Sequence, residues 1–420
     1  MLRDSNAMEG ADMATTMPDE TTLRAWWAHR QGLDGALAGA SAAEVLARTG
    51  WARSVGGAGP YLALFARAGI TRTAADAAVA ALAIHELPAA RGCTYVVPQA
   101  EFGLALRMGQ GFGDAAQVAT AKTYCGVSDD ELDRLRTAVL AALAAGPLDP
   151  KALKDALGDT VRNLGTEGKK RGMTTTLPLA LGTLQAKGAI RRVPVNGRLD
   201  QQRYRYARWD GLDDARLQLA SEAAHTELAR RYFRWIGPAT LAHFQWFSGL
   251  SGKAARAAVA PLGLVPLAPG ATDGGLMLFP DDLEALRAFR APAEPYFALV
   301  GWLDNVLHLR RDVAGLLAAE DRERRVFGER GAQLVGGLSE LPSHPIVDRG
   351  RLVGLWEYDP DAARIAWMTF APQPSALDAA IARTEAFIRD ELGDMRGFSL
   401  DSPESRRPRI AALRATHPIG

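Results

Sequence analysis

The chain has 420 residues, of which 48% are hydrophobic and 23% charged, and this composition indicates a globular protein long enough for about two to four domains. Its 49 basic and 48 acidic residues give a formal net charge of +1, which excludes polyanion binding through the charge of the whole molecule. The two cysteines, Cys93 and Cys125, have neither CxxC nor Cys/His ligand spacing, so we expect no disulfide framework, no metal and no cofactor.

Residues 1–20 are predicted to form a disordered leader, because this segment lacks the apolar core of a signal peptide. No apolar run in the chain approaches the roughly 20 residues that a membrane-spanning helix needs. Because the cysteine content fits a reducing compartment, we expect a cytoplasmic protein without membrane association. We also expect a monomer.

A first unit is predicted over residues 21–125. Apolar residues at helical spacing, a serine cap followed three residues later by glutamate, and Pro60 in a first helical turn predict helices before and after the glycine-rich stretch at residues 50–59. Alternating apolar and polar side chains then predict a strand in residues 90–98. The helices are expected over residues 21–33, 41–50, 60–70 and 71–87. Helices followed by a short hairpin are typical of a winged helix.

The same order recurs in two further predicted units, residues 126–212 and residues 213–280. In the second unit, three helical patterns precede two strand patterns, and Asn196-Gly197 between the strands is a strong hairpin signal. The third unit has three helical patterns, which begin at a cap or a proline and end at glycine, followed by two short strands. Repetition at this spacing predicts tandem winged helices.

The pattern changes over residues 281–398, which we predict to be a C-terminal α/β domain. Alternation in residues 344–372 predicts an antiparallel β meander, and a helix is expected over residues 376–393. Residues 399–420 are rich in proline and arginine and are predicted to be a mobile tail. The predicted fold class is therefore α+β, with three tandem winged-helix units followed by this domain.

Positive charge is concentrated in the second unit. Between Arg162 and Arg208 there are eleven basic residues and only two acidic ones, Glu167 and Asp200. Such an excess in a chain that is nearly neutral overall is typical of a surface that contacts the phosphate backbone of double-stranded DNA. Exposed hairpins also attract Lys and Arg for structural reasons. The predicted DNA-binding residues are Arg53, Ser54, Lys169, Lys170, Arg171, Arg191, Arg192, Arg198, Arg203, Tyr204 and Arg205.

Four segments together resemble the winged-helix DNA glycosylase family related to AlkZ and YcaQ, whose members excise alkylated bases and unhook interstrand crosslinks. The segments are PYLALFARAG, HELPAARGCTYVVPQAEF, LVGWLDNVLHLRRDV and SHPIVDRGRLVGLWEYDPDAARIAW, within a similarity that spans about Leu23 to Leu392. The third matches the family signature at Asp304, Asn305 and Arg310 but departs at His308 and Leu309. The fourth matches at Asp348, Gly350, Arg351, Val353 and Gly354.

The resemblance implies DNA repair as the function, but the chain departs from the family where catalysis is assigned. Relatives carry Gln-x-Gln or Gln-x-Asp just before the PYL helix; an ungapped count places this slot at residues 49–51, which are Thr, Gly and Trp, and neither motif occurs anywhere in the chain. The turn that carries aromatic and His residues in crosslink-unhooking members is Leu87–Arg91 here, with Glu86 and Cys93 retained. The weak catalytic candidates are Glu86, Asp304 and Asp348, each with an equally good interpretation as a cap or ion-pair partner.

The sequence is consistent with two functions, one of an enzyme and one of a non-catalytic binding protein. The first is a DNA glycosylase of DNA repair, which needs a carboxylate or amide to orient water against an oxocarbenium-like sugar. The second is a non-catalytic winged-helix DNA binder, either a transcription regulator or a damage sensor. A small-molecule binder that uses winged helices only as a scaffold is a third possibility.

Overall fold

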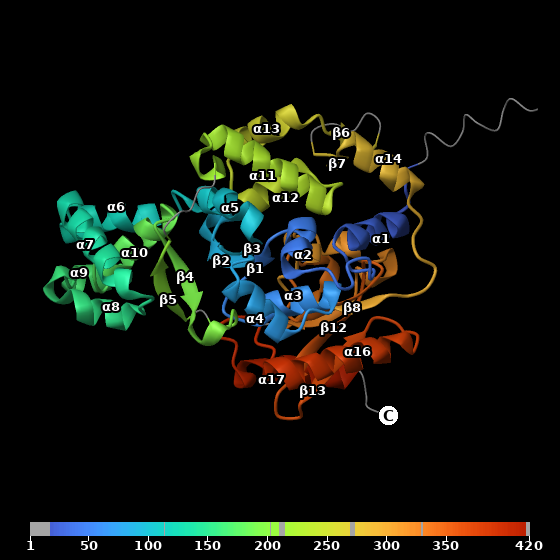
Figure 1. Ribbon diagram of the computed structural model, residues 1–420. Coiled ribbons are helices and arrows are strands. Elements are labelled where there is room, and N and C mark those ends of the chain that lie inside the picture. Colours follow the sequence, from blue (N-terminus) through green and yellow to red (C-terminus); the bar gives the residue numbers. More distant parts are fainter. Residues whose placement is uncertain are drawn as a thin grey trace, which may run out of the picture.

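The structure is a computed structural model that describes residues 17–112, 114–201, 203–209, 215–268, 274–328 and 331–416. It has a mixed α+β fold, which confirms the predicted class. Figure 1 shows a lobe of short helices beside a larger body that contains both the beginning and the end of the described chain. Most of the predicted leader, residues 1–16, lies outside the described residues. Helix α1 begins at Glu20, with Asp19 as its cap.

The first unit contains a three-stranded antiparallel sheet in the order β1-β3-β2. The helix expected over residues 71–87 ends early, because Leu82 takes a positive φ of 59°, and the following residues pair with β3 as a strand. The elements are α1 (Glu20–Arg30), α2 (Ala42–Thr49), β1 (Ala52–Arg53), α3 (Gly59–Ala68), α4 (Arg72–Ala80), β2 (Ile84–Pro88), β3 (Thr94–Pro98) and α5 (Phe102–Gly109).

The second unit forms the separate lobe at the left of Figure 1 and has apolar clusters of its own. Helix α6, which falls within the predicted bounds of the first unit, contributes Ala121 to a cluster with Val127 and Leu132. The elements are α6 (Asp114–Cys125), α7 (Asp129–Ala142), α8 (Pro150–Leu157), α9 (Gly165–Lys169), α10 (Leu177–Ala186), β4 (Ile190–Pro194) and β5 (Tyr204–Arg208). An isolated bridge joins Leu148 to Tyr206 of β5.

Strands β4 and β5 pair antiparallel, as Asn196-Gly197 suggested, but the connection is not a two-residue turn. Both residues have positive φ, of 63° and 74°, and the loop then continues to the start of β5. The Leu199 N–H donates to the Tyr61 hydroxyl at 2.8 Å, which ties the loop to the first unit. The expected exposed wing is therefore anchored to the larger body.

The third unit shares one apolar core with the first. Trp26 and Trp27 of α1 donate through their indole nitrogens to Gly237 O and Pro238 O at 2.8 and 3.0 Å, and Trp235 donates to Ala47 O at 2.9 Å. Buried indoles with satisfied N–H groups join the two units firmly. The elements are α11 (Ser221–Ile236), α12 (Leu241–Ser248), α13 (Gly252–Val259), β6 (Val265–Pro266) and β7 (Met277–Leu278), with a bridge between Ala239 and Met277.

The C-terminal part is built on a four-stranded antiparallel sheet in the order β13-β12-β11-β8, and this confirms the predicted meander. The register shifts between Ile346 and Val347 of β11, where the strand bulges. The elements are α14 (Pro280–Ala288), β8 (Phe297–Leu299), α15 (Asn305–His308), β9 (Arg325–Gly328), β10 (Gly331–Leu334), β11 (His344–Asp348), β12 (Arg351–Asp359), β13 (Arg364–Thr369), α16 (Ala376–Phe387) and α17 (Pro403–Thr416).

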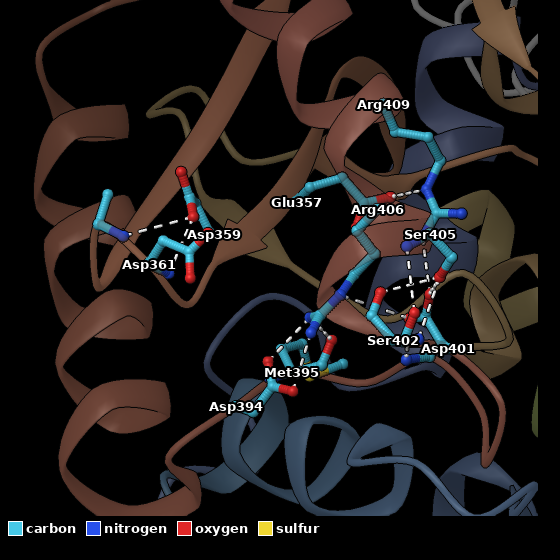
Figure 2. A network of polar contacts seen from close by, with 12 residues as sticks. Glu357, Asp359, Asp361, Asp394, Met395, Asp401, Ser402, Ser405, Arg406 and Arg409 are labelled. Atoms are coloured by element: carbon cyan, nitrogen blue, oxygen red, sulfur yellow. Dashed lines mark hydrogen bonds and ion pairs between the residues drawn. The ribbon is translucent and has the colours of Figure 1, made fainter.

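The expectation of a mobile tail over residues 399–420 is wrong for α17, which packs against β12 and β13. Figure 2 shows how arginines of this helix meet carboxylates of the body. Arg406 is fully buried and donates to both oxygens of Asp394 at 2.8 Å. Arg409 donates to Glu357 at 2.8 Å and to Asp401 at 3.0 Å. Of these partners, Glu357 and Asp394 precede the predicted tail, and Asp401 lies within it.

No helix of the described residues is long and apolar enough to cross a bilayer.

Candidate functional site

Asp304 serves a structural role. Its carboxylate caps α15 by accepting from the Val306 N–H at 3.0 Å. It also accepts two hydrogen bonds from Arg67 of α3, at 2.7 and 2.8 Å, and both side chains are 1% exposed. The neighbouring Asn305 donates to Thr49 O at 3.0 Å. These residues of the predicted signature therefore hold α15 against α2 and α3, and Asp304 has no free oxygen for catalysis.

Asp348 also has structural partners. It accepts from the Tyr296 N–H at 2.9 Å and pairs with Arg349 at 2.8 Å, at the turn between β11 and β12. A carboxylate with these partners stabilises the turn. The structure does not gather the three predicted carboxylates into one site, since Glu86 lies on β2 with a different set of neighbours.

Glu86 is a buried carboxyl group, and the Tyr204 hydroxyl interacts with it. Its Oε1 accepts a hydrogen bond from the Ser54 hydroxyl, and burial raises the pKa of its carboxyl group. Tyr204 of β5 and Arg192 of β4 approach it from the second unit. Ser54 is 0% exposed, so it is not placed to contact a DNA phosphate, contrary to expectation.

The slot at residues 49–51 faces the protein core. The Thr49 hydroxyl donates to Val45 O at 2.8 Å within α2, and Gly50 follows with φ of 97°. Trp51 is 0% exposed and donates from its indole to Glu101 at 2.5 Å. Glu101, which the sequence patterns did not single out, also pairs with Arg231 at 2.8 Å. None of the three slot residues presents an acceptor to solvent or to a substrate.

A different set of side chains meets beside this slot, and we call it the arginine cluster. Its members come from the first unit, from α12 and from the segment around α15. The Arg53 guanidinium carbon lies 5.4 Å from the Tyr95 ring centroid, and Tyr95 and His308 are 6.4 Å apart between ring centroids. Trp246 has Arg91 at 4.1 Å, Arg311 at 5.3 Å and His308 at 4.9 Å. The members are Arg53, Arg91, Tyr95, Trp246, His308 and Arg311.

Burial controls the ionisation of the two most enclosed members. Burial, together with the charges of the three arginines, lowers the pKa of His308 to about 3, so the ring is neutral at physiological pH. Burial raises the pKa of Tyr95 to about 12, so its hydroxyl keeps its proton. Only Arg53 was predicted to bind DNA. His308 had a signal in the sequence, because it departs from the signature that its neighbours Asp304 and Asn305 match.

Of the predicted basic residues at the end of α9, two form ion pairs and one is exposed. Lys170 pairs with Glu167 at 2.8 Å and Arg171 with the same carboxylate at 2.6 Å. Arg171 also lies 4.0 Å from the Tyr124 ring. Lys169 is exposed. This end of the lobe keeps a positive charge excess at its surface.

The predicted wing residues fall into two groups. Arg203 and Arg205 are exposed, and no described residue pairs with either side chain. The others have protein partners: Arg191 lies over Trp209, Arg192 over Tyr204, and Arg198 pairs with Asp200 at 2.9 Å and with Leu392 O at 3.3 Å. The Tyr204 hydroxyl is buried, and burial and the Glu86 charge raise its pKa. Tyr204, predicted to bind DNA, therefore turns its hydroxyl toward Glu86 in the protein interior.

No group of three or more His, Cys, Asp or Glu side chains in the described part of the chain is arranged to hold a metal ion.

Comparison with known proteins identifies the relatives of this chain. The family described as DNA glycosylase AlkZ-like matches residues 46–398. Among solved structures, the Streptomyces sahachiroi DNA glycosylase AlkZ is similar with a TM-score of 0.64 and 20% sequence identity, over 89% of this chain and 97% of that chain. At this identity the structural similarity establishes the fold. No curated protein matches the sequence.

Proposed function

Because the chain belongs to the AlkZ-like DNA glycosylase family, as its resemblance indicated, we propose that it binds double-stranded DNA in DNA repair. Starting from α2, α7 and α11, each of the three units has the order helix, strand or bridge, helices and two-stranded hairpin. Two helices precede the hairpin in the first and third units and three in the second, and we interpret all three units as winged helices. This order supports DNA binding, because winged helices place helices and hairpins against the duplex. A cytoplasmic location and a monomeric state remain predictions.

The observation that carries the proposal is the unpaired positive charge on the second unit. Arg203 and Arg205 project from β5 or the residues before it, and Lys169 lies exposed at the end of α9. Such residues contact phosphates without reading bases, and they fix the protein on the duplex. The neutral chain as a whole supplies no comparable attraction.

We propose further that the protein recognises DNA without excising a base by the chemistry of the Gln-x-Gln motif. Water attack on a glycosidic carbon requires an acceptor that orients the water and stabilises the developing positive charge. Thr49 and Trp51 use their polar atoms within the core, as described above, and Gly50 has no side chain. The function supported best is therefore that of a damage sensor or another non-catalytic binder.

Glycosylase activity is the second candidate, and Glu86 is the observation that favours it. A buried carboxyl group with a raised pKa is a typical general acid or base. This candidate predicts base release from DNA carrying N7-alkylated purines. It further requires that Glu86→Gln abolish the release while DNA binding persists.

The binding surface is tested by the salt dependence of affinity. We expect Arg203→Ala and Arg205→Ala each to weaken binding to duplex DNA of any sequence and to reduce the slope of log K against log salt by about 0.9 for each lost phosphate contact. Titration of labelled duplex at several salt concentrations, followed by fluorescence anisotropy, measures this slope. The matched control is Arg287→Ala on α14, an exposed arginine on the opposite side of the molecule in Figure 1.

If the slope is unchanged in both wing variants, the DNA surface lies elsewhere. An equal loss of slope in Arg287→Ala would show that any exposed arginine contributes, and this would also contradict the assignment.

A further inference from the structure

The arginine cluster contains buried polar atoms without partners. Nε2 of His308 makes no hydrogen bond to any described residue, and its side chain is more than nine-tenths buried. The Nε atoms of Arg91 and Arg311 are likewise buried and unpaired. The Tyr95 hydroxyl beside His308 is also buried and interacts with the Arg91 side chain. Buried polar atoms in native proteins nearly always have partners. Three unpaired nitrogen atoms within one cluster, on His308, Arg91 and Arg311, therefore point to a ligand.

The charge of the cluster gives the sign of that ligand. Arg53, Arg91 and Arg311 bring three positive charges near one neutral histidine, and only Arg311 has a carboxylate partner among the described residues, Glu340 at 3.0 Å. Arg53 donates instead to the backbone oxygens of Thr94 and Ser54, at 2.7 and 3.2 Å. Like charges held together without counter-charge are unfavourable, and an anion would relieve the repulsion.

Part of the cluster is accessible to solvent. Tyr95 and His308 are buried at its base, while Arg53, Arg91, Arg311 and Trp246 are partly exposed. Arg91 and Arg311 both lie against Trp246, at 4.1 and 5.3 Å from its centroid, so the ring holds their guanidinium groups in place. Guanidinium groups fixed in this way suit the tetrahedral oxygens of a phosphate.

We propose that the arginine cluster binds a phosphate group, which Arg91 and Arg311 contact from the exposed side and the Tyr95 hydroxyl and His308 ring contact from the buried base. In part this rests on the proposed function, since the DNA backbone is one source of such a group. Free inorganic phosphate is the other source.

Two variants of the full-length protein test the assignment. Arg91→Gln removes one charge but keeps an aliphatic stem against Trp246, and Tyr95→Phe removes the buried hydroxyl but keeps the ring in the core. Circular dichroism and thermal unfolding in chloride show whether each variant folds. Arg287→Gln, far from the cluster on α14, is the matched control.

Two readouts separate the sources of phosphate. In the first, thermal unfolding is followed in phosphate and in chloride at equal ionic strength and pH. We expect phosphate to stabilise the native protein and the control, and we expect about tenfold weaker apparent phosphate affinity in each cluster variant. In the second, duplex DNA is titrated at several salt concentrations. We expect Arg91→Gln to reduce the slope of log K against log salt by about 0.9.

Each outcome decides between the proposals. Phosphate stabilisation that needs Arg91 and Tyr95, in a protein that does not bind DNA, would support the cluster as a free-phosphate site and overturn the proposed function. A lower DNA slope in Arg91→Gln without any effect of free phosphate would assign the cluster to the backbone alone. DNA binding with an unchanged slope, together with no difference between native protein and variants in phosphate, would overturn the cluster assignment and leave the proposed function intact. If neither free phosphate nor duplex DNA binds, both the cluster assignment and the proposed function are overturned.

Discussion

Arg406→Ala is expected to lower the free energy of unfolding by about 3–5 kcal/mol, the usual cost of removing one partner from a buried ion pair. Arg406 is 0% exposed and donates to both oxygens of Asp394 and to Met395 O at 3.0 Å. Alanine would remove these bonds and leave a cavity between α17 and the body. Urea unfolding followed by far-UV circular dichroism measures the change.

The adjacent Arg407 provides the matched control. Its side chain is 67% exposed and reaches Asp361 only at 3.8 Å, so Arg407→Ala is expected to change the stability by about 0–1 kcal/mol. A loss of less than about 1 kcal/mol in Arg406→Ala as well would contradict the docking of α17 seen in Figure 2.

The second large effect is a loss of stability in mild acid, caused by buried histidines. Burial lowers the pKa of His344 to about 3, with Arg409 and Arg406 adding to the effect and Asp401 opposing it. Its Nδ1 accepts a hydrogen bond from the Trp302 N–H at 3.1 Å, a bond that needs the unprotonated nitrogen. The unfolded chain binds the proton near the ordinary value of about 6.5.

The stability that neutral His344 contributes is therefore complete above about pH 6.5 and is lost as the pH falls toward 3, at about 1.4 kcal/mol per pH unit. His308, whose pKa is also lowered to about 3, adds a similar slope. The variant His344→Asn keeps an acceptor near the Nδ1 position but cannot bind the proton. We expect its unfolding free energy to fall less steeply with decreasing pH than that of the native protein, by about the 1.4 kcal/mol per pH unit of one proton. Urea unfolding at several pH values between about 7 and 5 measures it.

His29→Asn serves as the comparison, since His29 is 38% exposed and lies beside Asp34, which can pair with its charge. An unfolding free energy of His344→Asn that falls with pH as steeply as that of the native protein would show that His344 does not titrate on unfolding.

The sequence predicted the parts of the fold that depend on local patterns. Alternation identified strands β11 to β13, and the cap at Ser41 with Glu44 identified the start of α2, because these signals come from neighbouring residues. The end of α4 was missed, since the left-handed turn at Leu82 is set by the pairing of β2 with β3. The helix α17 was missed because its composition does not show that its arginines pair with Asp394 and Glu357.

The site was predicted less well, for a related reason. Composition identified Arg203 and Arg205 as exposed charges, but it could not show that Ser54 and Tyr204 are turned toward the buried Glu86. The arginine cluster joins residues from three parts of the chain, so no motif contains it. Residue type alone does not distinguish a free arginine from one with a partner.

Binding and base release measured together on one DNA give the most direct test of the central claim. Duplexes with and without N7-alkylated purines are incubated with the protein and with an active relative as positive control, then assayed for affinity and for alkali-labile abasic sites. We predict binding that weakens with salt and is weaker in Arg203→Ala and Arg205→Ala, with no abasic sites above background. Abasic sites that disappear in Glu86→Gln, or absence of DNA binding at low salt, would contradict the account.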